Sequence, residues 1–149
     1  MAIFTISKKE VRSMVEISEE YRGIINKPGR IGTLSTADAE GKPNVAYFGS
    51  PRLHDDGTFA MGLAGGRTLQ NLKANPNAVF FCVEEGPVSF TTRGCRLYLK
   101  VREIQTEGPL LDLIKEMIAK HVNEAAANMM QAAVAFDVTE VRPLLDMGG

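Results

Sequence analysis

The sequence predicts a mainly β fold with flanking helices, an antiparallel barrel of about six strands. Most of the expected strands follow one another through short turns rich in Gly, Asp and Pro, which is typical of hairpin connections. Two longer segments and one short segment instead carry apolar residues at helical spacing. No repeat, low-complexity tract or linker divides the chain, so a single domain over residues 1–149 is expected. An open α+β sheet is the alternative architecture.

A first helix is expected at about residues 7–27. Ser7 and Glu10 have the spacing of a capping box, in which the two side chains satisfy backbone N–H groups at a helix start. Apolar residues then recur at helical spacing as far as Ile25, and Pro28-Gly29 ends the pattern. We expect this helix to pack against a sheet.

A barrel is expected over about residues 30–145, and it begins with three strands joined by two turns. The first turn, 37–42, is polar and contains a glycine, and the second contains Asp56-Gly57, which favours a tight reverse turn. On the third strand Ala60 and Gly62 form a face of small side chains. Such a face lets a flat ligand or another backbone approach closely, and packing of the first helix explains it equally well. The three strands are expected at 30–36, 44–53 and 58–63.

The second half of the barrel is expected to supply three further strands and a helix. Val79–Val83 is apolar at every position, which suits a strand buried on both faces. In the longer strand 90–104 apolar and polar residues alternate, and Gly94 is a candidate bend. Pro109 suits the first position of a helix, and 132–141 forms the last strand. The residues expected on the buried stripe of that helix are Leu110, Leu113, Ile114, Met117 and His121.

The segment Ala64–Leu72, between the third strand and a short helix, points most directly to a ligand. Its two glycines allow a sharp turn and a close approach to a bound group. Arg67 then supplies a fork-shaped cation and Thr68 a hydroxyl where helix N–H groups begin, a combination that suits a phosphate. The alternative is an ordinary Gly-Gly turn with Thr68 as a helix cap. Asn75-Pro76 ends the short helix.

Composition and charge argue against several classes of partner. The formal net charge is −1, and no basic run stands out that would bind nucleic acid. No apolar stretch approaches the length of a membrane span, and the first residues lack the order of a signal peptide. A cytoplasmic protein without nucleic-acid or membrane partners is therefore expected.

The cysteines and histidines carry no metal-ligand spacing. Cys82 and Cys95 are expected to be reduced and partly buried, with a redox pair between them as the alternative. His54 and His121 are far apart in the sequence and lie near the ends of expected elements. We therefore expect no metal site.

Four motifs occur in an order that resembles a known family. They are Gly41–Ala46 on the second strand, Arg67–Pro76 after the third, Phe90–Cys95, and Glu107-Gly108-Pro109. Together they resemble the FMN-binding split barrels related to pyridoxamine 5'-phosphate oxidase, in particular the small bacterial FMN-binding proteins. The resemblance covers roughly residues 25–145. It implies a six-stranded antiparallel split β-barrel, FMN as the cofactor, and a homodimer that holds FMN at the subunit interface.

The resemblance also assigns residues to the FMN site. Arg67 and Thr68 match the basic and hydroxyl residues that hold the FMN phosphate. Asn71 matches a position that supports the phosphate loop. The positions that match those lining the isoalloxazine ring are Tyr47, Phe48, Gly49, Ser50, Leu63 and Ala64.

The implied function is that of an FMN-dependent oxidoreductase, with the substrate and the catalytic residues unassigned. The alternatives are a non-enzymatic FMN carrier or electron-transfer protein, or a binder of F420 or haem. Gly66 and Thr68 stand where the larger oxidases tend to have a polar phosphate ligand and a lysine. Oxidation of pyridoxamine phosphate is therefore not expected.

Overall fold

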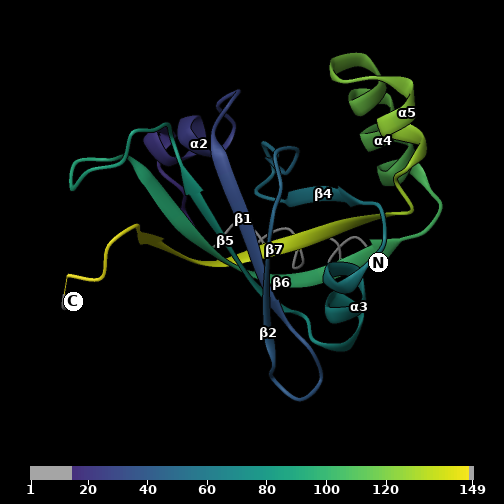
Figure 1. The fold of residues 1–149 in the computed structure, drawn as a ribbon, viewed down its shortest axis with the longest axis horizontal. Helices are drawn as coiled ribbons and strands as arrows, with labels where there is room; N and C mark the ends of the chain where they lie inside the picture. The colour runs from purple at the N-terminus through teal and green to yellow at the C-terminus, as the bar shows by residue number, and fades with distance from the viewer. Residues whose placement is uncertain (1–14, 148–149) are drawn as a thin grey trace, which may run out of the picture.

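The structure, a computed structural model, describes residues 15–147 of the chain. Seven antiparallel strands form one sheet that curls into a half-barrel, in the spatial order β2-β1-β5-β6-β7-β4-β3 (Figure 1). The strands are β1 (Ile31–Ala37), β2 (Pro43–Tyr47), β3 (Arg52–Leu53), β4 (Phe59–Leu63), β5 (Asn77–Val83), β6 (Gly94–Gln105) and β7 (Ala132–Pro143). The helices are α2 (Glu19–Ile25), α3 (Arg67–Ala74), α4 (Pro109–His121) and α5 (Glu124–Asn128). The predicted class, a mainly antiparallel barrel with flanking helices, is confirmed.

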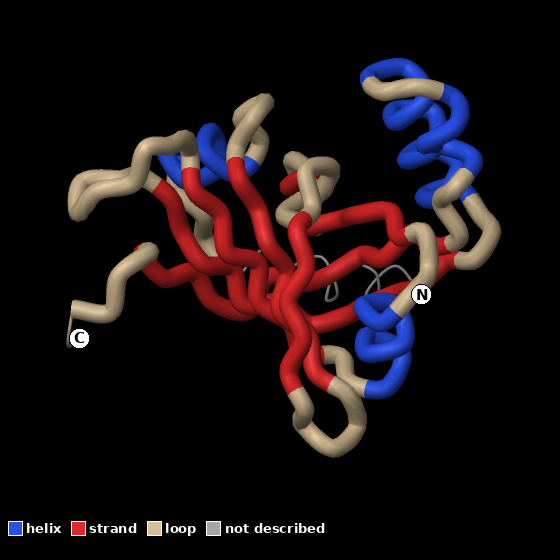
Figure 2. Tube along the Cα trace, in the orientation of Figure 1, coloured by secondary structure: helices blue, strands red, loops and turns tan. Residues whose placement is uncertain are grey.

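The helices lie around the edges of the curved sheet. Helices α4 and α5 stand together at one end and α2 at the other, while α3 lies beside β1 and β2 (Figure 2). No helix within residues 15–147 is both long and apolar enough to cross a membrane.

The predicted second strand, 44–53, is two strands. The chain leaves the sheet after Tyr47 and returns as β3 at Arg52. Segment 48–51 is not part of a strand, because the side chain of Arg30 bonds the carbonyl groups of Phe48, Gly49 and Pro51, and Pro51 has no N–H for a strand ladder. The sheet therefore has one strand more than predicted, and β2 and β3 form its two edges.

Of the predicted helix at about residues 7–27, the structure describes only residues 15–27, and these are helical from Glu19 to Ile25. The predicted capping box at residues 7–10 lies outside the described residues, and residues 15–18 are not helical. Helix α2 begins at Glu19, because the hydroxyl of Ser18 accepts a hydrogen bond from the N–H of Tyr21 at 3.1 Å. The helix buries Ile24 and Ile25 against the core.

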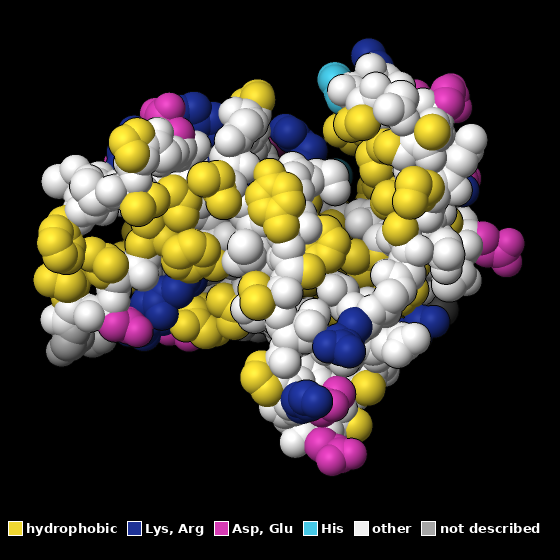
Figure 3. Space-filling model, in the orientation of Figure 1, with side chains coloured by type: hydrophobic (Ala, Val, Ile, Leu, Met, Phe, Trp, Pro, Cys, Tyr) yellow, Lys and Arg dark blue, Asp and Glu magenta, His cyan; other side chains and the backbone are white. Residues whose placement is uncertain are grey.

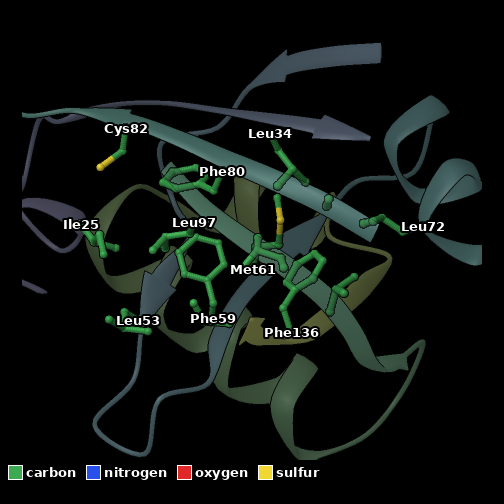
Figure 4. Packing of buried hydrophobic residues seen from close by; sticks show 14 of the residues in the cluster. Ile25, Leu34, Leu53, Phe59, Met61, Leu72, Phe80, Cys82, Leu97 and Phe136 are labelled. Atoms are coloured by element: carbon green, nitrogen blue, oxygen red, sulfur yellow. The ribbon is translucent and has the colours of Figure 1, made fainter. Parts of the chain in front are cut away.

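Three phenylalanine rings occupy the centre of the half-barrel (Figure 4). The ring centroids of Phe59 and Phe80 lie 4.9 Å apart, and those of Phe59 and Phe136 lie 6.2 Å apart, in tilted arrangements. Other residues on the inner faces of β4, β6 and β7 are also buried. They are Met61, Leu63, Leu97, Leu99, Val134 and Val138.

The small-residue face of β4 packs under a helix. A Cβ atom on Gly62 would lie 2.8 Å from Cγ2 of Ile114 and 2.9 Å from Sδ of Met130. Ala60 on the same face is buried as well. The covering element is α4 with the chain after α5, so the predicted packing against the first helix is wrong and no flat ligand can lie on this face.

Strand β5 is not buried on both faces as predicted. Ala78, Phe80 and Cys82 lie in the core, whereas Phe81 is 38% exposed on the other face. Beside Phe81 on this outer face, Ile31 of β1 and Val45 and Tyr47 of β2 are exposed as well. The apolar run Val79–Val83 therefore forms a strand with one face in the core and Phe81 exposed on the other face.

The bend of β6 and the buried side of α4 also differ from the predictions. Strand β6 is irregular between Tyr98 and Leu99 and again between Val101 and Glu103, whereas Gly94 is the first residue of the strand. Helix α4 begins at Pro109 as predicted, but its buried residue is Leu111 and Leu113 is exposed. The helix meets both β4 and α5, and those contacts determine its buried side. The short helix α5 was not predicted.

Cys82 and Cys95 face one another across β5 and β6. They are register partners, their Sγ atoms are 4.0 Å apart, and both thiols are free and fully buried. The neighbouring thiol and burial both raise the pKa of Cys95 above its usual value. Both cysteines are thus more deeply buried than the predicted partial burial, and their reduced state stays a prediction.

Candidate functional site

The turn between β4 and α3 leaves backbone N–H groups at the helix start without a cap. Gly65 and Gly66 adopt φ values of +102° and +89°, which strain any residue with a side chain. The first hydrogen bond of the helix runs from Gln70 N–H to the carbonyl of Gly66 at 3.1 Å. The N–H groups of residues 67–69 therefore have no partner within the helix. A Cβ on Gly66 would meet no atom within 4 Å, so a ligand can approach the turn from this side.

The other described helices have polar side chains that satisfy their first N–H groups. Ser18 caps α2, Asn123 caps α5, and Oε1 of Gln105 accepts from Leu110 N–H of α4 at 2.9 Å. Each also carries an acidic residue in its first turn. Helix α3 has neither feature within residues 15–147. An anion from outside the chain would complement both its N–H groups and its dipole.

The predicted phosphate residues lie at this helix start. Arg67 is exposed and forms no ion pair within the described chain. Thr68 is the second helical residue and only 6% exposed, so the alternative of Thr68 as an N-cap is wrong; the cap position belongs to Gly66. Nδ2 of Asn71 donates to Oγ1 of Thr36 on β1 at 3.0 Å. That hydrogen bond fixes α3 on the sheet, as a supporting residue would.

The predicted ring-lining residues divide into two groups. Tyr47 is 65% exposed at the end of β2, and Gly49 and Ser50 follow it at the surface. Ala64 is exposed in the turn before α3, whereas the side chain of Leu63 is buried in the core. Helix α3 packs on β1 and β2. Of the predicted ring-lining residues, Tyr47, Gly49, Ser50 and Ala64 are thus at the surface, whereas the side chains of Phe48 and Leu63 pack in or against the core.

Arg30 is a site-supporting residue that the sequence analysis missed. The residue is 4% exposed, and its guanidinium donates to the carbonyls of Ile25 (2.6 Å), Phe48 (3.4 Å), Gly49 (3.2 Å) and Pro51. It also lies 5.0 Å from the ring centroid of Phe80. Burial lowers the pKa of the guanidinium from its usual value. An arginine at a strand start resembles any surface arginine in sequence, so no local pattern marked it.

The bonds of Arg30 determine what segment 48–50 offers to solvent. Three carbonyls of residues 48–51 point inward to the guanidinium. The N–H of Phe48 donates to Gly32 at 2.9 Å, but those of Gly49 and Ser50 donate to no atom within residues 15–147. Two backbone donors therefore remain at the surface beside Tyr47.

An uncovered apolar area, here called the outer patch, adjoins these donors. It consists of Ile31, Val45, Tyr47 and Phe81 on β1, β2 and β5. Thr33 is the register partner of both Tyr47 and Phe81, so the two aromatic residues lie in one row across the sheet. Figure 3 shows hydrophobic side chains gathered over these strands. Large contiguous apolar areas of this kind mark interaction surfaces.

A separate groove of about 700 Å³ lies between the β5–β6 connection and the C-terminal residues. It contains none of the predicted site residues. Its charged side chains pair among themselves, Arg93 with Glu20 at 3.9 Å and Arg142 with Asp146 at 3.7 Å. The groove therefore lacks the donors that distinguish the start of α3.

Comparison with known proteins identifies the family. A family model described as pyridoxamine 5'-phosphate oxidase matches residues 17–144. The chain belongs to this family. The matched range contains every predicted site residue, and the resemblance drawn from the motif order is confirmed. No curated protein sequence matches this family member.

Solved structures share the fold of this family member. An FMN-binding protein from Syntrophomonas wolfei subsp. wolfei is 22% identical with a TM-score of 0.77, and the match covers 99% of each chain. An F420 reductase is 18% identical with a TM-score of 0.64, over 84% of this chain and 98% of that chain. The haem storage protein HutZ from Vibrio cholerae is 16% identical with a TM-score of 0.62, over 87% and 96%.

We expect Arg30→Lys to lower the free energy of unfolding by about 2–4 kcal/mol, because an ammonium group cannot reproduce the forked bonds to buried carbonyls. Arg52→Lys, at an exposed position of β3, is the matched control and should change stability by less than about 0.5 kcal/mol. Urea unfolding followed by circular dichroism measures both. Equal stability of the two variants would contradict the role given to Arg30.

Proposed function

We propose that this protein is an FMN-binding flavoprotein that holds the FMN phosphate at the start of α3. The observation that carries the proposal is an uncapped helix start with Arg67 beside it, in a chain of this family. A phosphate monoester carries about −1.5 to −2 charges near neutral pH. The N–H groups of residues 67–69, the fork of Arg67 and the hydroxyl of Thr68 supply donors of the kind that such a group requires.

The end of β2 is proposed to hold the isoalloxazine ring. Tyr47 offers an exposed aromatic face, and the N–H groups of Gly49 and Ser50 are unpaired within the described chain. Those donors suit a ring carbonyl or nitrogen, and Arg30 keeps them turned outward by bonding the carbonyls of the same segment. Bound FMN supplies hydride or electron transfer, and the protein supplies its orientation and electrostatic surroundings.

The test compares FMN with riboflavin, which lacks the phosphate. In the variant Arg67→Ala/Thr68→Ala, FMN affinity should fall by about 100-fold or more while riboflavin affinity changes little, since hydrogen bonds to a charged group are lost. Lys73→Ala, in the last turn of the same helix, is the matched control and should retain parental FMN affinity. Quenching of flavin fluorescence measures all the constants. Parental FMN binding by the double variant would refute the phosphate site.

We further propose that the bound flavin serves an oxidoreductase related to pyridoxamine 5'-phosphate oxidase. On anaerobic addition of NADH or NADPH, the yellow protein should bleach rapidly with at least one of them. Slow reduction by both would point instead to an FMN carrier. A purified protein that takes up F420 or haem in preference to FMN would overturn the FMN assignment.

The outer patch supports a homodimer with FMN at the subunit interface. Tyr47 belongs both to the patch and to the proposed ring site, so an interface on the patch would reach the flavin. A second copy of the chain offers the same apolar area, as a two-fold interface requires. FMN would then be enclosed between the subunits.

We expect light scattering to give the mass of two chains for the parent protein. Phe81→Glu should give one chain, because it places a charge in the centre of the apolar contact. Phe90→Glu, an exposed phenylalanine outside the patch, should remain dimeric. A monomeric parent protein, or a dimeric Phe81→Glu protein, would contradict this interface.

A further inference from the structure

Gln131 lies directly against the turn that opens α3. It precedes β7, and its N–H donates to the carbonyl of Leu63 at 2.8 Å. A Cβ atom on Gly65 would lie 3.1 Å from Oε1 of Gln131 and 3.4 Å from its Cδ. The carboxamide therefore occupies the space beside Gly65, while the side of Gly66 is open.

The chain contains a second turn of the same construction. Gly108 has a φ of +132° and precedes α4, and a Cβ on it would lie 2.8 Å from Oε1 of Gln105. There the glutamine caps the helix, accepting from the N–H groups of Leu110 and Leu111 at 2.9 and 3.4 Å. The carboxamide of Gln131, by contrast, makes no hydrogen bond within residues 15–147. Its donors and acceptor are thus unused next to a helix start that is also uncapped.

Packing of the preceding residue and a backbone hydrogen bond fix the position of Gln131. The preceding residue, Met130, packs with Ile114 of α4 over Gly62 of β4. The N–H bond to Leu63 holds the backbone of Gln131 on the other side. These contacts fix the backbone of Gln131 beside the turn, and its exposed side chain lies against Gly65.

We propose that Gln131 is a further phosphate ligand, whose carboxamide N–H donates to the FMN phosphate across the turn from Arg67. This assignment rests on the proposed phosphate site at α3. A neutral amide donates to a dianion without adding charge, whereas a carboxylate of the same shape would repel it. Gln131 thus contributes to discrimination between phosphorylated and unphosphorylated flavins.

The experiment measures the ratio of FMN to riboflavin affinity in the full-length protein by fluorescence quenching. Gln131→Glu should reduce this ratio about tenfold or more, because it places a carboxylate beside the phosphate. Gln131→Met, similar in shape but without donors, should reduce it several-fold by losing one bond to a charged group. Riboflavin affinity should stay within about twofold in both variants. Thermal melting of the flavin-free proteins verifies that each variant folds.

The outcomes separate this inference from the function it rests on. A parent protein that binds riboflavin as tightly as FMN overturns the phosphate site and the role of Gln131 together. A parent protein that prefers FMN, with an unchanged ratio in Gln131→Glu, overturns the role of Gln131 alone. Equal weakening of both flavins in Gln131→Glu also overturns it, since the residue would then only shape the turn.

Discussion

The arrangement of the proposed site depends on one buried guanidinium. Within residues 15–147 the guanidinium of Arg30 forms no ion pair; its N–H groups donate instead to the backbone carbonyls of Ile25, Phe48, Gly49 and Pro51. A buried charge is tolerated only where such partners surround it. The same bonds interrupt the second strand, tie the end of α2 to the edge of the sheet, and turn two backbone N–H groups outward. The hydrogen bonds that stabilise Arg30 in the core therefore also set the backbone conformation of the proposed site.

The proposed site has two parts, which come from separate segments of the chain. One part is proposed to bind the phosphate and the other to bind the flavin ring. The start of α3 offers a positive dipole, two glycines and Arg67, and the hydrogen bond between Asn71 and Thr36 holds it on β1. The end of β2 offers an aromatic face and the donors exposed by Arg30. Helices α4 and α5 close the far side of the glycine turn through Met130 and Gln131. The outer patch beside Tyr47 is the surface on which we propose that a second subunit docks.

Features that depend on a few adjacent residues could be predicted from the sequence. Features that depend on contacts between residues distant in the sequence could not. Pro109 at a helix start, Asp56-Gly57 in a hairpin and Gly-Gly-Arg-Thr at a helix start are each recognisable from a few adjacent residues, and the structure has all three elements there. Arg30 and Gln131 act through residues far away in sequence, so their roles have no local pattern. The apolar run in β5 predicted burial on both faces, but periodicity does not reveal whether another element covers the second face. The same limitation affected α4, whose buried side is set by β4 and α5.

The most direct measurement of the central claim is a titration of the ¹⁵N-labelled protein with FMN and with riboflavin, followed by amide resonances. If the start of α3 binds the phosphate, the amides of Arg67, Thr68 and Leu69 will shift strongly with FMN and hardly at all with riboflavin, while those of Gly49 and Ser50 will respond to both. Unchanged amides at the start of α3 on addition of FMN, or equal shifts with both flavins, would contradict the claim.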